Sequence, residues 1–352
     1  MGEGSTLLVV FGLLLGGAVG AVLRRTHYCF MGALADLRLF GSRRRLRSYA
    51  LALAVALVGS QLAAAATPFA WPQTPYFTAP LYGLGALAGG LAFGFGMVLA
   101  GGCLSRALTR AATGSLKAWL VLLLAGASGM STSALLDVWA PSSPGLLGRL
   151  AEVWQQRPGW ALALAFALAA VLAGYALRDP ALRRFGPELK AALALGLLVA
   201  AGFALVGLVS GGGTGERIPA TSVNYLRALV ALGSGAGGPL FAFMAALLLG
   251  TLAGAALAAG PRAIRLEGLA GADLVRHVQG GLLMGIGGAL AGGCTLGVAL
   301  AGAAALAPTA WLATLAMMAG GVWGVAYLER GRLWPPFAAR SAPAETDSSA
   351  AG

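Results

Sequence analysis

The chain has 352 residues, of which 58% are hydrophobic and only 10% are charged, and its mean hydropathy is +0.81. Ordinary soluble domains carry about 25% charged residues, so the composition excludes a soluble protein and indicates a polytopic membrane protein. The net charge of +12 does not indicate a nucleic-acid partner, because the basic residues form no dense patch beside aromatic residues. They lie between hydrophobic runs instead, as in cytoplasmic loops.

Nine apolar runs are candidate membrane-spanning helices, since a span needs about 20 mainly apolar residues. They are residues 7–23, 48–66, 81–100, 118–138, 159–177, 191–209, 239–259, 278–293 and 310–328. No basic residue precedes the first run, so we expect a retained helix rather than a cleaved signal. The uncharged connection at 67–80, rich in proline and aromatic residues, is expected to be an extracytoplasmic loop. The small, polar tail after Arg340 is typical of a disordered segment.

The distribution of Lys and Arg predicts the orientation of the chain. If the N-terminus lies outside, 20 of the 24 basic residues fall on the cytoplasmic side. The four on the other side are Arg149, Arg157, Arg217 and Arg227. By the positive-inside rule, the N-terminus is expected outside and the C-terminus in the cytoplasm.

Two similar stretches indicate an internal duplication. Gly90–Cys103 reads GLAFGFGMVLAGGC and Gly281–Cys294 reads GLLMGIGGALAGGC, identical at nine of fourteen positions. Matches of Gly, Ala and Leu carry little weight in apolar helices, but the chain has only three cysteines and two of them coincide here. The predicted topology gives the two stretches opposite directions, which is the arrangement of inverted-repeat transporters.

We therefore expect an all-α fold of two inverted halves joined by a linker. Residues 1–138 would form the first repeat of four spans, and residues 139–190 a linker with the fifth span. Residues 191–330 would form the second repeat, and residues 331–352 a cytoplasmic tail. In this architecture the substrate site lies near the membrane midplane, between the repeats.

Each cysteine opens a short helical stretch that cannot span a membrane alone. These stretches follow Cys29, Cys103 and Cys294, and we expect re-entrant or interfacial half-helices there. The pairs Gly101–Gly102 and Gly292–Gly293 allow the chain to turn before two of them. A helix start offers free N–H groups and partial positive charge, so each thiol would sit where an anion is stabilised.

A thiol is soft, polarisable and a weak hydrogen-bond donor, which suits a substrate with a soft sulfur or selenium atom. Zinc or Cu(I) binding is a rival interpretation, but the two histidines, His27 and His277, do not accompany Cys103 or Cys294. A disulfide-exchange enzyme would favour a C-x-x-C pair, which the sequence lacks. A membrane sulfurtransferase remains an alternative, and it would require the cysteines to carry persulfide.

Other polar residues in the spans are expected to make local helix bonds or to lie at the interface. They are Ser60, Gln61, Ser128, Ser131, Thr132, Ser133, Asp137 and Ser210. The basic run Arg43–Arg47 is most simply a topology anchor, with docking of an acidic partner as the secondary interpretation. No nucleotide-binding G-x-x-x-x-G-K-[ST] motif is present, so primary pumping by this chain is not expected.

Three stretches resemble the YeeE/YedE family of bacterial sulfur transporters. They are RTHYCFMGALADLRLFG (Arg25–Gly41), the run GGCLSRALTRAATGSLKA from Gly101 and GGCTLGVALAG from Gly292. The resemblance covers nearly the whole chain. It implies uptake of thiosulfate across the bacterial inner membrane, through a path lined by Cys29, Cys103 and Cys294. It also implies work beside a small cytosolic TusA-like sulfur carrier, and some relatives are thought to serve selenium.

The sequence therefore predicts a transporter, not an enzyme, that carries thiosulfate or a related sulfur anion without a cofactor or metal. A selenium-compound transporter is the alternative within the same class. Members of the family often have a polar residue where Val298 stands, so the path here is expected to be drier. The inverted topology further predicts that an anion from outside meets Cys294 first and then Cys103 and Cys29.

Overall fold

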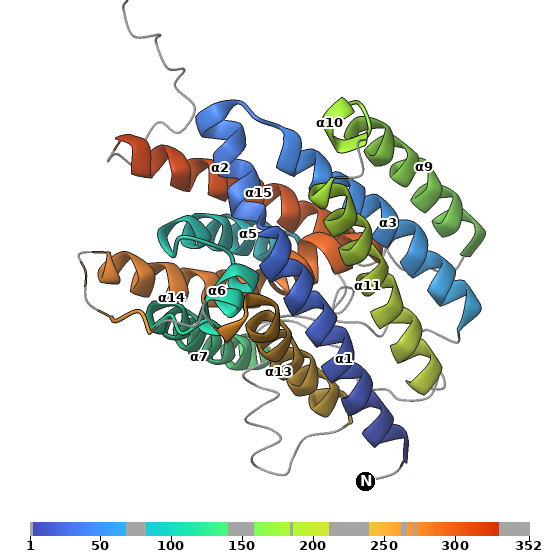
Figure 1. The fold of residues 1–352 in the computed structure, drawn as a ribbon, viewed down its shortest axis with the longest axis horizontal. Helices are drawn as coiled ribbons and strands as arrows, with labels where there is room; N and C mark the ends of the chain where they lie inside the picture. Colours follow the sequence, from blue (N-terminus) through green and yellow to red (C-terminus); the bar gives the residue numbers. More distant parts are fainter. Residues whose placement is uncertain are drawn as a thin grey trace, which may run out of the picture.

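The computed structural model describes residues 3–67, 82–139, 158–183, 186–210, 239–261, 266–269, 271 and 273–330. Within these ranges the chain folds into helices joined by turns, with no β-strand (Figure 1). The helices are α1 (Glu3–Thr26), α2 (Phe30–Phe40), α3 (Arg44–Ala66), α5 (Tyr82–Leu99), α6 (Leu104–Ala111), α7 (Leu116–Trp139), α9 (Pro158–Ala176), α10 (Pro180–Arg183), α11 (Pro187–Ser210), α13 (Pro239–Ala259), α14 (Leu274–Ala291), η3 (Thr295–Gly302) and α15 (Pro308–Arg330).

Nine helices in the described part of the chain are long and apolar enough to cross a membrane. This confirms the prediction of an all-α polytopic membrane protein. Four helices, α1, α3, α11 and α14, begin four residues before their predicted starts, so that α14 begins at Leu274 rather than at residue 278. α14 includes Arg276 and His277. Their low hydropathy kept them out of the predicted span, although such residues are compatible with a helix end at the membrane surface. The connection at 68–80 and the tail after Arg340 lie outside the described residues.

Glycines allow close packing between α1 and α13, which lie side by side in Figure 1. Gly12, Gly16 and Gly20 are spaced four residues apart and face successive turns of α13. A Cβ atom at Gly12 would lie 2.8 Å from the carbonyl oxygen of Phe243. Gly20, two turns further along α1, faces Thr251, two turns further along α13. The contacts advance together along both helices, so α1 and α13 are parallel. Small residues that let backbones approach are the usual basis of helix association in lipid.

The same parallel arrangement relates α3 and α11. Ala52 of α3 lies against Gly196, and Gly59 lies against Ala200 further along both helices. These two helices are the second and sixth spans, whereas α1 and α13 are the first and seventh. An even number of crossings separates the two helices of each pair, so a chain that crosses the membrane with each successive span requires them to be parallel.

The remaining large packing group is formed by α5, α7, α14 and α15. Gly89 of α5 lies against Ala291 and Gly96 lies against Gly280, so α5 and α14 are antiparallel. Contacts of the same kind make α5 parallel to α15 and α7 parallel to α14. All these directions fit nine consecutive crossings.

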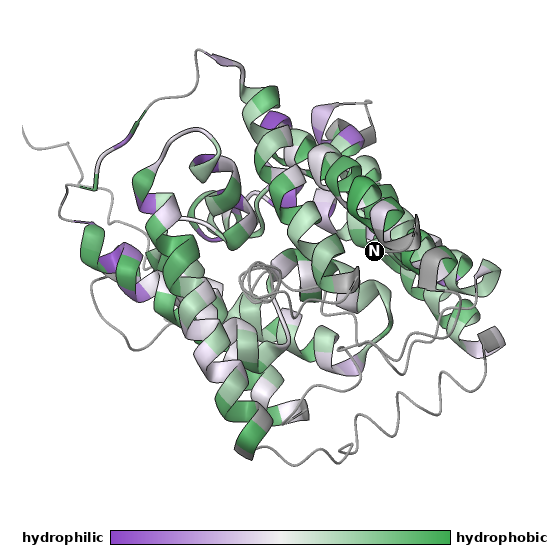
Figure 2. Cartoon of the chain, turned by 90° about the horizontal axis from the view of Figure 1, so that it is seen from below, coloured by the Kyte–Doolittle hydropathy of each residue, from purple (hydrophilic) through white to green (hydrophobic). Residues whose placement is uncertain are grey.

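Apolar residues cover most of the helical surface, and hydrophilic residues gather mainly toward helix ends (Figure 2). At one such end Arg44 lies 2.6 Å from a carboxylate oxygen of Glu188, and Arg47 lies 3.2 Å from Asp179. These ion pairs connect the start of α3 to the segments that begin α10 and α11. The basic run predicted as a topology anchor thus also contacts neighbouring helices.

Candidate functional site

The three cysteines occupy the same local position, immediately before a short helix. Cys29 precedes α2, Cys103 precedes α6 and Cys294 precedes η3, each with an extended backbone. All three side chains are buried and none forms a disulfide. α2 has 11 residues, and α6 and η3 have eight each, too few to cross a membrane. η3 is a π-helix, which the sequence did not predict.

The turns before these helices use the left-handed backbone region, where glycine is favoured. Gly101 has φ +71°, Gly292 +81° and Gly293 +148°. Gly102 has an ordinary φ, but a Cβ there would lie 2.8 Å from the side chain of Arg106. The turn before Cys29 has no glycine, and His27 takes the left-handed conformation with φ +49°. Histidine is among the residues that enter this region more often than most.

Two of the thiols lie next to each other. The sulfur atoms of Cys29 and Cys103 are 3.8 Å apart, within the range of a weak S–H hydrogen bond. Cys103 is also 3.0 Å from the hydroxyl oxygen of Ser105, and either group can donate. The turn between α1 and α2 and the turn between α5 and α6 therefore meet at one pair of thiols.

The third cysteine turn lies beside this pair. The backbone N–H of Gly297 donates to the sulfur of Cys294 at 3.5 Å, so a free helix-start donor is directed at the thiol. The side chain of the next residue, Thr295, interacts with Cys103. The structure thus brings together the three turns that the sequence singled out.

Tyr49 of α3 holds the cysteine turns from one side. Its ring packs against Tyr28 and Phe30, with ring centroids 5.9 and 4.8 Å away. Its hydroxyl donates to the carbonyl oxygen of Thr295 at 2.9 Å. The residues on either side of Cys29 therefore connect, through Tyr49, to the residue after Cys294. A lone tyrosine in an apolar span was the only sequence signal of this role.

The polar residues of the spans were expected to make local helix bonds or to lie at the interface, and the structure shows both local bonds and bonds to neighbouring segments. Ser60 and Gln61 both donate to the carbonyl oxygen of Ala304, at 2.9 and 3.2 Å, and so attach α3 to the segment after η3. Ser128 and Thr132 donate to carbonyls of their own helix, and the Ser128 hydroxyl also lies 3.3 Å from the carbonyl oxygen of Leu282 in α14. The side chains of Asp137 and Ser210 are outside the described residues. Ser105 was not singled out, although it stands only two residues after Cys103.

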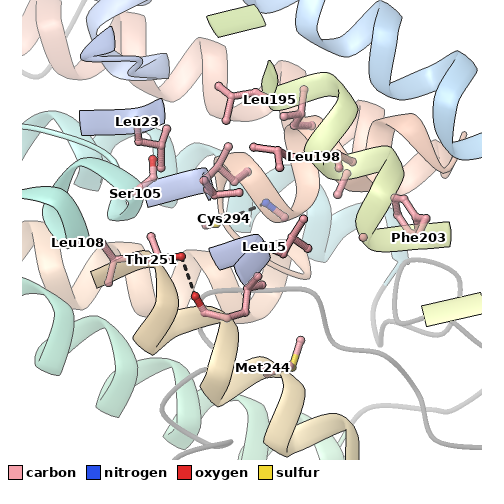
Figure 3. A pocket seen from close by; sticks show the side chains of 18 of the residues that line it. Leu15, Leu23, Ser105, Leu108, Leu195, Leu198, Phe203, Met244, Thr251 and Cys294 are labelled. Atoms are coloured by element: carbon pink, nitrogen blue, oxygen red, sulfur yellow. Dashed lines mark hydrogen bonds between the residues drawn. The ribbon is translucent and has the colours of Figure 1, made fainter. Parts of the chain in front are cut away.

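A cavity of about 160 Å³ leads to Cys294 (Figure 3). Since a single water needs about 10–15 Å³, the space is large enough for a small anion. Most of its wall is apolar and comes from α1, α11 and α13. These residues include Leu15, Leu195, Leu198, Phe203, Phe243 and Met244. Cys294 and Ser105 lie at the wall near η3, whereas Cys29 and Cys103 do not line the cavity.

Among the described residues that line the cavity, Cys294 is the only one with an ionisable side chain. Among the described residues, no group of three or more His, Cys, Asp and Glu side chains is arranged to hold a metal ion. Formal charges lie elsewhere, for example at Lys117, whose ammonium donates to Asp273 at 2.7 Å. This hydrogen bond lowers the pKa of the Asp273 carboxyl below its ordinary value.

Comparisons with known proteins agree with one another. Residues 25–323 match a family described as sulphur transport. The chain is 29% identical to the thiosulfate transporter TsuA of Spirochaeta thermophila over 336 residues, which are 90% of this chain and 98% of that protein. It is 30% identical to the thiosulfate transporter TsuA of Escherichia coli over 122 residues, 33% of this chain and 31% of that protein. It is also 30% identical to the probable transporter YedE of Salmonella typhimurium over 135 residues, 38% of this chain and 31% of that protein.

Proposed function

Since the chain belongs to the sulphur transport family, we propose that it carries thiosulfate inward across the bacterial inner membrane along a path lined by Cys29, Cys103 and Cys294. The observation that carries this proposal is the meeting of three cysteine turns, distant in sequence, at the end of an apolar cavity. The names of two relatives supply the substrate. The family and these relatives make the chain a transporter rather than an enzyme.

The chemistry of the site suits an anion with a soft sulfur atom. Neutral thiols donate weakly, so S–H groups can hold an anionic sulfur without trapping it. Conduction through several sites requires this balance, because each contact must be favourable enough to enter and weak enough to leave. A lysine or arginine among the cysteines would bind the anion more tightly and slow its release.

Helix starts offer a complementary contact for the oxygen atoms of the substrate. The first N–H groups of α2, α6 and η3 lack partners within their own helices and carry partial positive charge. The N–H of Gly297, which donates to the sulfur of Cys294, is one such group. In the proposed mode the oxyanion end meets these donors while the thiols meet the terminal sulfur.

The helix packing supports the proposed duplication of residues 1–138 in residues 191–330. The duplication would make α1 equivalent to α11, α3 to α13, α5 to α14 and α7 to α15. Exchange of these equivalent helices converts the α1–α13 pair into the α3–α11 pair. It also converts the α5–α15 pair into the α7–α14 pair, and it leaves the α5–α14 pair unchanged. Equivalent spans would run in opposite directions, as in inverted repeats with a central substrate site.

The position of the cavity supports entry at Cys294. Phe243 lies four residues after the start of α13, and Val206 four residues before the end of α11. Both of these helix ends lie on the side of the N-terminus of α1, which the distribution of basic residues predicts to be outside. An anion would enter here, reach Cys294, and pass to Cys103 and then Cys29.

The proposal is tested with purified full-length protein in liposomes. We expect uptake of radiolabelled thiosulfate that is intact after entry, and loss of uptake in Cys103→Ala and Cys294→Ala. Selenium-containing and sulfite competitors, added in excess, identify the preferred anion. Absence of thiosulfate uptake by correctly folded wild-type protein, with uptake of a selenium anion, would overturn the assigned substrate.

A further inference from the structure

The hydroxyl group of Ser105 differs from most hydroxyls in the described helices. Thr251, Ser128 and Thr314 donate to carbonyl oxygens of their own helices, at 2.7, 2.7 and 2.6 Å. In such a bond the hydroxyl donates its only hydrogen to the backbone, so it is not available to donate to a substrate. The Ser105 hydroxyl instead interacts with the thiol of Cys103 at 3.0 Å. A thiol is a weak partner, so this hydroxyl can exchange it for a stronger acceptor.

Ser105 also has a particular place in the path. It is only 5% exposed, yet it lines the cavity together with Cys294. Cys103 does not line the cavity, but it contacts Ser105 on one side and Cys29 on the other. Ser105 therefore stands between the cavity with Cys294 and the buried Cys29–Cys103 pair.

We infer that Ser105 is a fourth substrate-binding residue, whose hydroxyl donates to the oxygen end of the anion as it passes from Cys294 to Cys103. The inference rests on the proposed transport of thiosulfate. A hydroxyl is a stronger donor to oxygen than a thiol is, whereas the thiol is the softer partner for sulfur. Ser105 and Cys103 together would recognise a small anion that has both a terminal sulfur and oxygen atoms.

The contact also has a consequence for the Cys103 thiol. When Ser105 donates to the substrate, it no longer competes for the Cys103 sulfur, and the S–H of Cys103 is free to turn toward the incoming anion. Exchange of one partner for another keeps the buried hydroxyl satisfied at each step. A buried polar group left without a partner would otherwise destabilise the intermediate.

The test compares Ser105→Ala with Ser128→Ala in the full-length protein reconstituted in liposomes. Both variants remove one hydroxyl from a membrane helix, but that of Ser128 bonds to carbonyl oxygens of its own helix and of Leu282 in α14 and does not line the cavity. We expect Ser105→Ala to raise the half-saturating thiosulfate concentration by about tenfold or more, the size of a lost hydrogen bond to a charged group. Ser128→Ala is expected to match wild type. Equal half-saturation in the two variants would overturn the inference.

A binding measurement separates this role from a folding defect. Thiosulfate should raise the thermal midpoint of wild type and Ser128→Ala, and raise that of Ser105→Ala much less at the same concentration. If Ser105→Ala is unstable without ligand, Ser105→Thr keeps the hydroxyl and should restore binding; equal loss in both would overturn the inference. If wild type itself binds and transports no thiosulfate, the proposed function fails instead.

Discussion

The sulfur atoms of Cys29 and Cys103 lie 3.8 Å apart although 74 residues separate them in the sequence. Each residue ends a turn after a different long helix, so the contact depends on how α1 and α5 are placed relative to each other. Neither residue lines the cavity, but Cys103 contacts Ser105, which lines the cavity together with Cys294. An anion that meets Cys294 first would therefore reach this pair last.

Replacement of the cysteines should show whether their sulfur atoms contact the substrate or only fill space in the fold. Cys103→Ala and Cys294→Ala are expected to abolish growth of cells that depend on thiosulfate as their sulfur source. Cys103→Ser keeps a donor of similar size but loses the soft match, so uptake should be slowed by about tenfold or more, as for one lost contact to an ion. Normal growth of both alanine variants would remove the thiols from the mechanism.

The Cys29–Cys103 distance predicts that oxidation will close the path. A disulfide needs a sulfur–sulfur distance of about 2.05 Å, which small shifts of the two side chains from 3.8 Å could reach. Diamide would accept the two electrons and two protons that the thiols lose. We expect diamide to block uptake in liposomes and dithiothreitol to restore it.

The matching control for this oxidation is Cys29→Ser, which should retain slow uptake that diamide does not change. Mass spectrometry would detect the Cys29–Cys103 peptide pair in blocked wild type only. The same measurement bears on the sulfurtransferase alternative, because transport through neutral thiols leaves no persulfide on any cysteine during turnover. Diamide inhibition that persists in Cys29→Ser would contradict the prediction.

Tyr49→Phe tests whether the cysteine turns are held together by side-chain contacts. The variant keeps the aromatic packing but leaves the carbonyl of Thr295 without its 2.9 Å partner. We expect the free energy of unfolding to fall by about 1–3 kcal/mol and thiosulfate uptake to decrease. Tyr327→Phe is a control, because Tyr327 packs on Phe95 through its ring. Equal effects of the two variants would assign Tyr49 to general packing.

Much of the architecture could be predicted from the sequence because hydropathy and charge are local properties. The nine spans follow from runs of apolar residues, and the turns follow from glycine pairs, with Gly101 and Gly292 in the left-handed region as expected. Boundaries were less accurate where polar residues such as His277 continue a helix beyond the apolar run.

The details of the site could not be predicted in the same way. The contact between Cys29 and Cys103, and that between Tyr49 and Thr295, join helices far apart in sequence. Their formation depends on packing, which one sequence does not reveal. Ser105 was missed because a serine in a helix usually bonds to its own backbone, and only the structure shows that its partner is a thiol.

The Lys117–Asp273 ion pair predicts a specific loss of stability in acid. The hydrogen bond from Lys117 lowers the pKa of Asp273 in the folded state, so the pair stabilises the fold fully above the unfolded pKa of about 3.9. This contribution is lost as the pH falls through the lower, folded pKa. The thermal midpoint of Asp273→Asn should therefore depend less on pH below about 4 than that of wild type. Identical acid profiles would contradict the assigned pair.

The order of the cysteines along the path can be tested by labelling from outside. The cavity includes Cys294 in its wall but not Cys29 or Cys103. An impermeant thiol reagent added outside should therefore modify Cys294 fastest, and excess thiosulfate should protect it. Preferential outside labelling of Cys29 would overturn both the order and the orientation of the termini.

Filling the cavity should slow this labelling if the cavity is the route of entry. Val199 of α11 lines the cavity, so Val199→Trp places a large side chain inside it. Val171→Trp is a matched control, because Val171 lies on the outer surface of α9 and is 70% exposed. We expect Val199→Trp to slow both the modification of Cys294 and the uptake of thiosulfate, and Val171→Trp to change neither. Fast labelling of Cys294 in a correctly folded Val199→Trp variant would mean that the reagent, and with it the anion, reaches the thiol by another route.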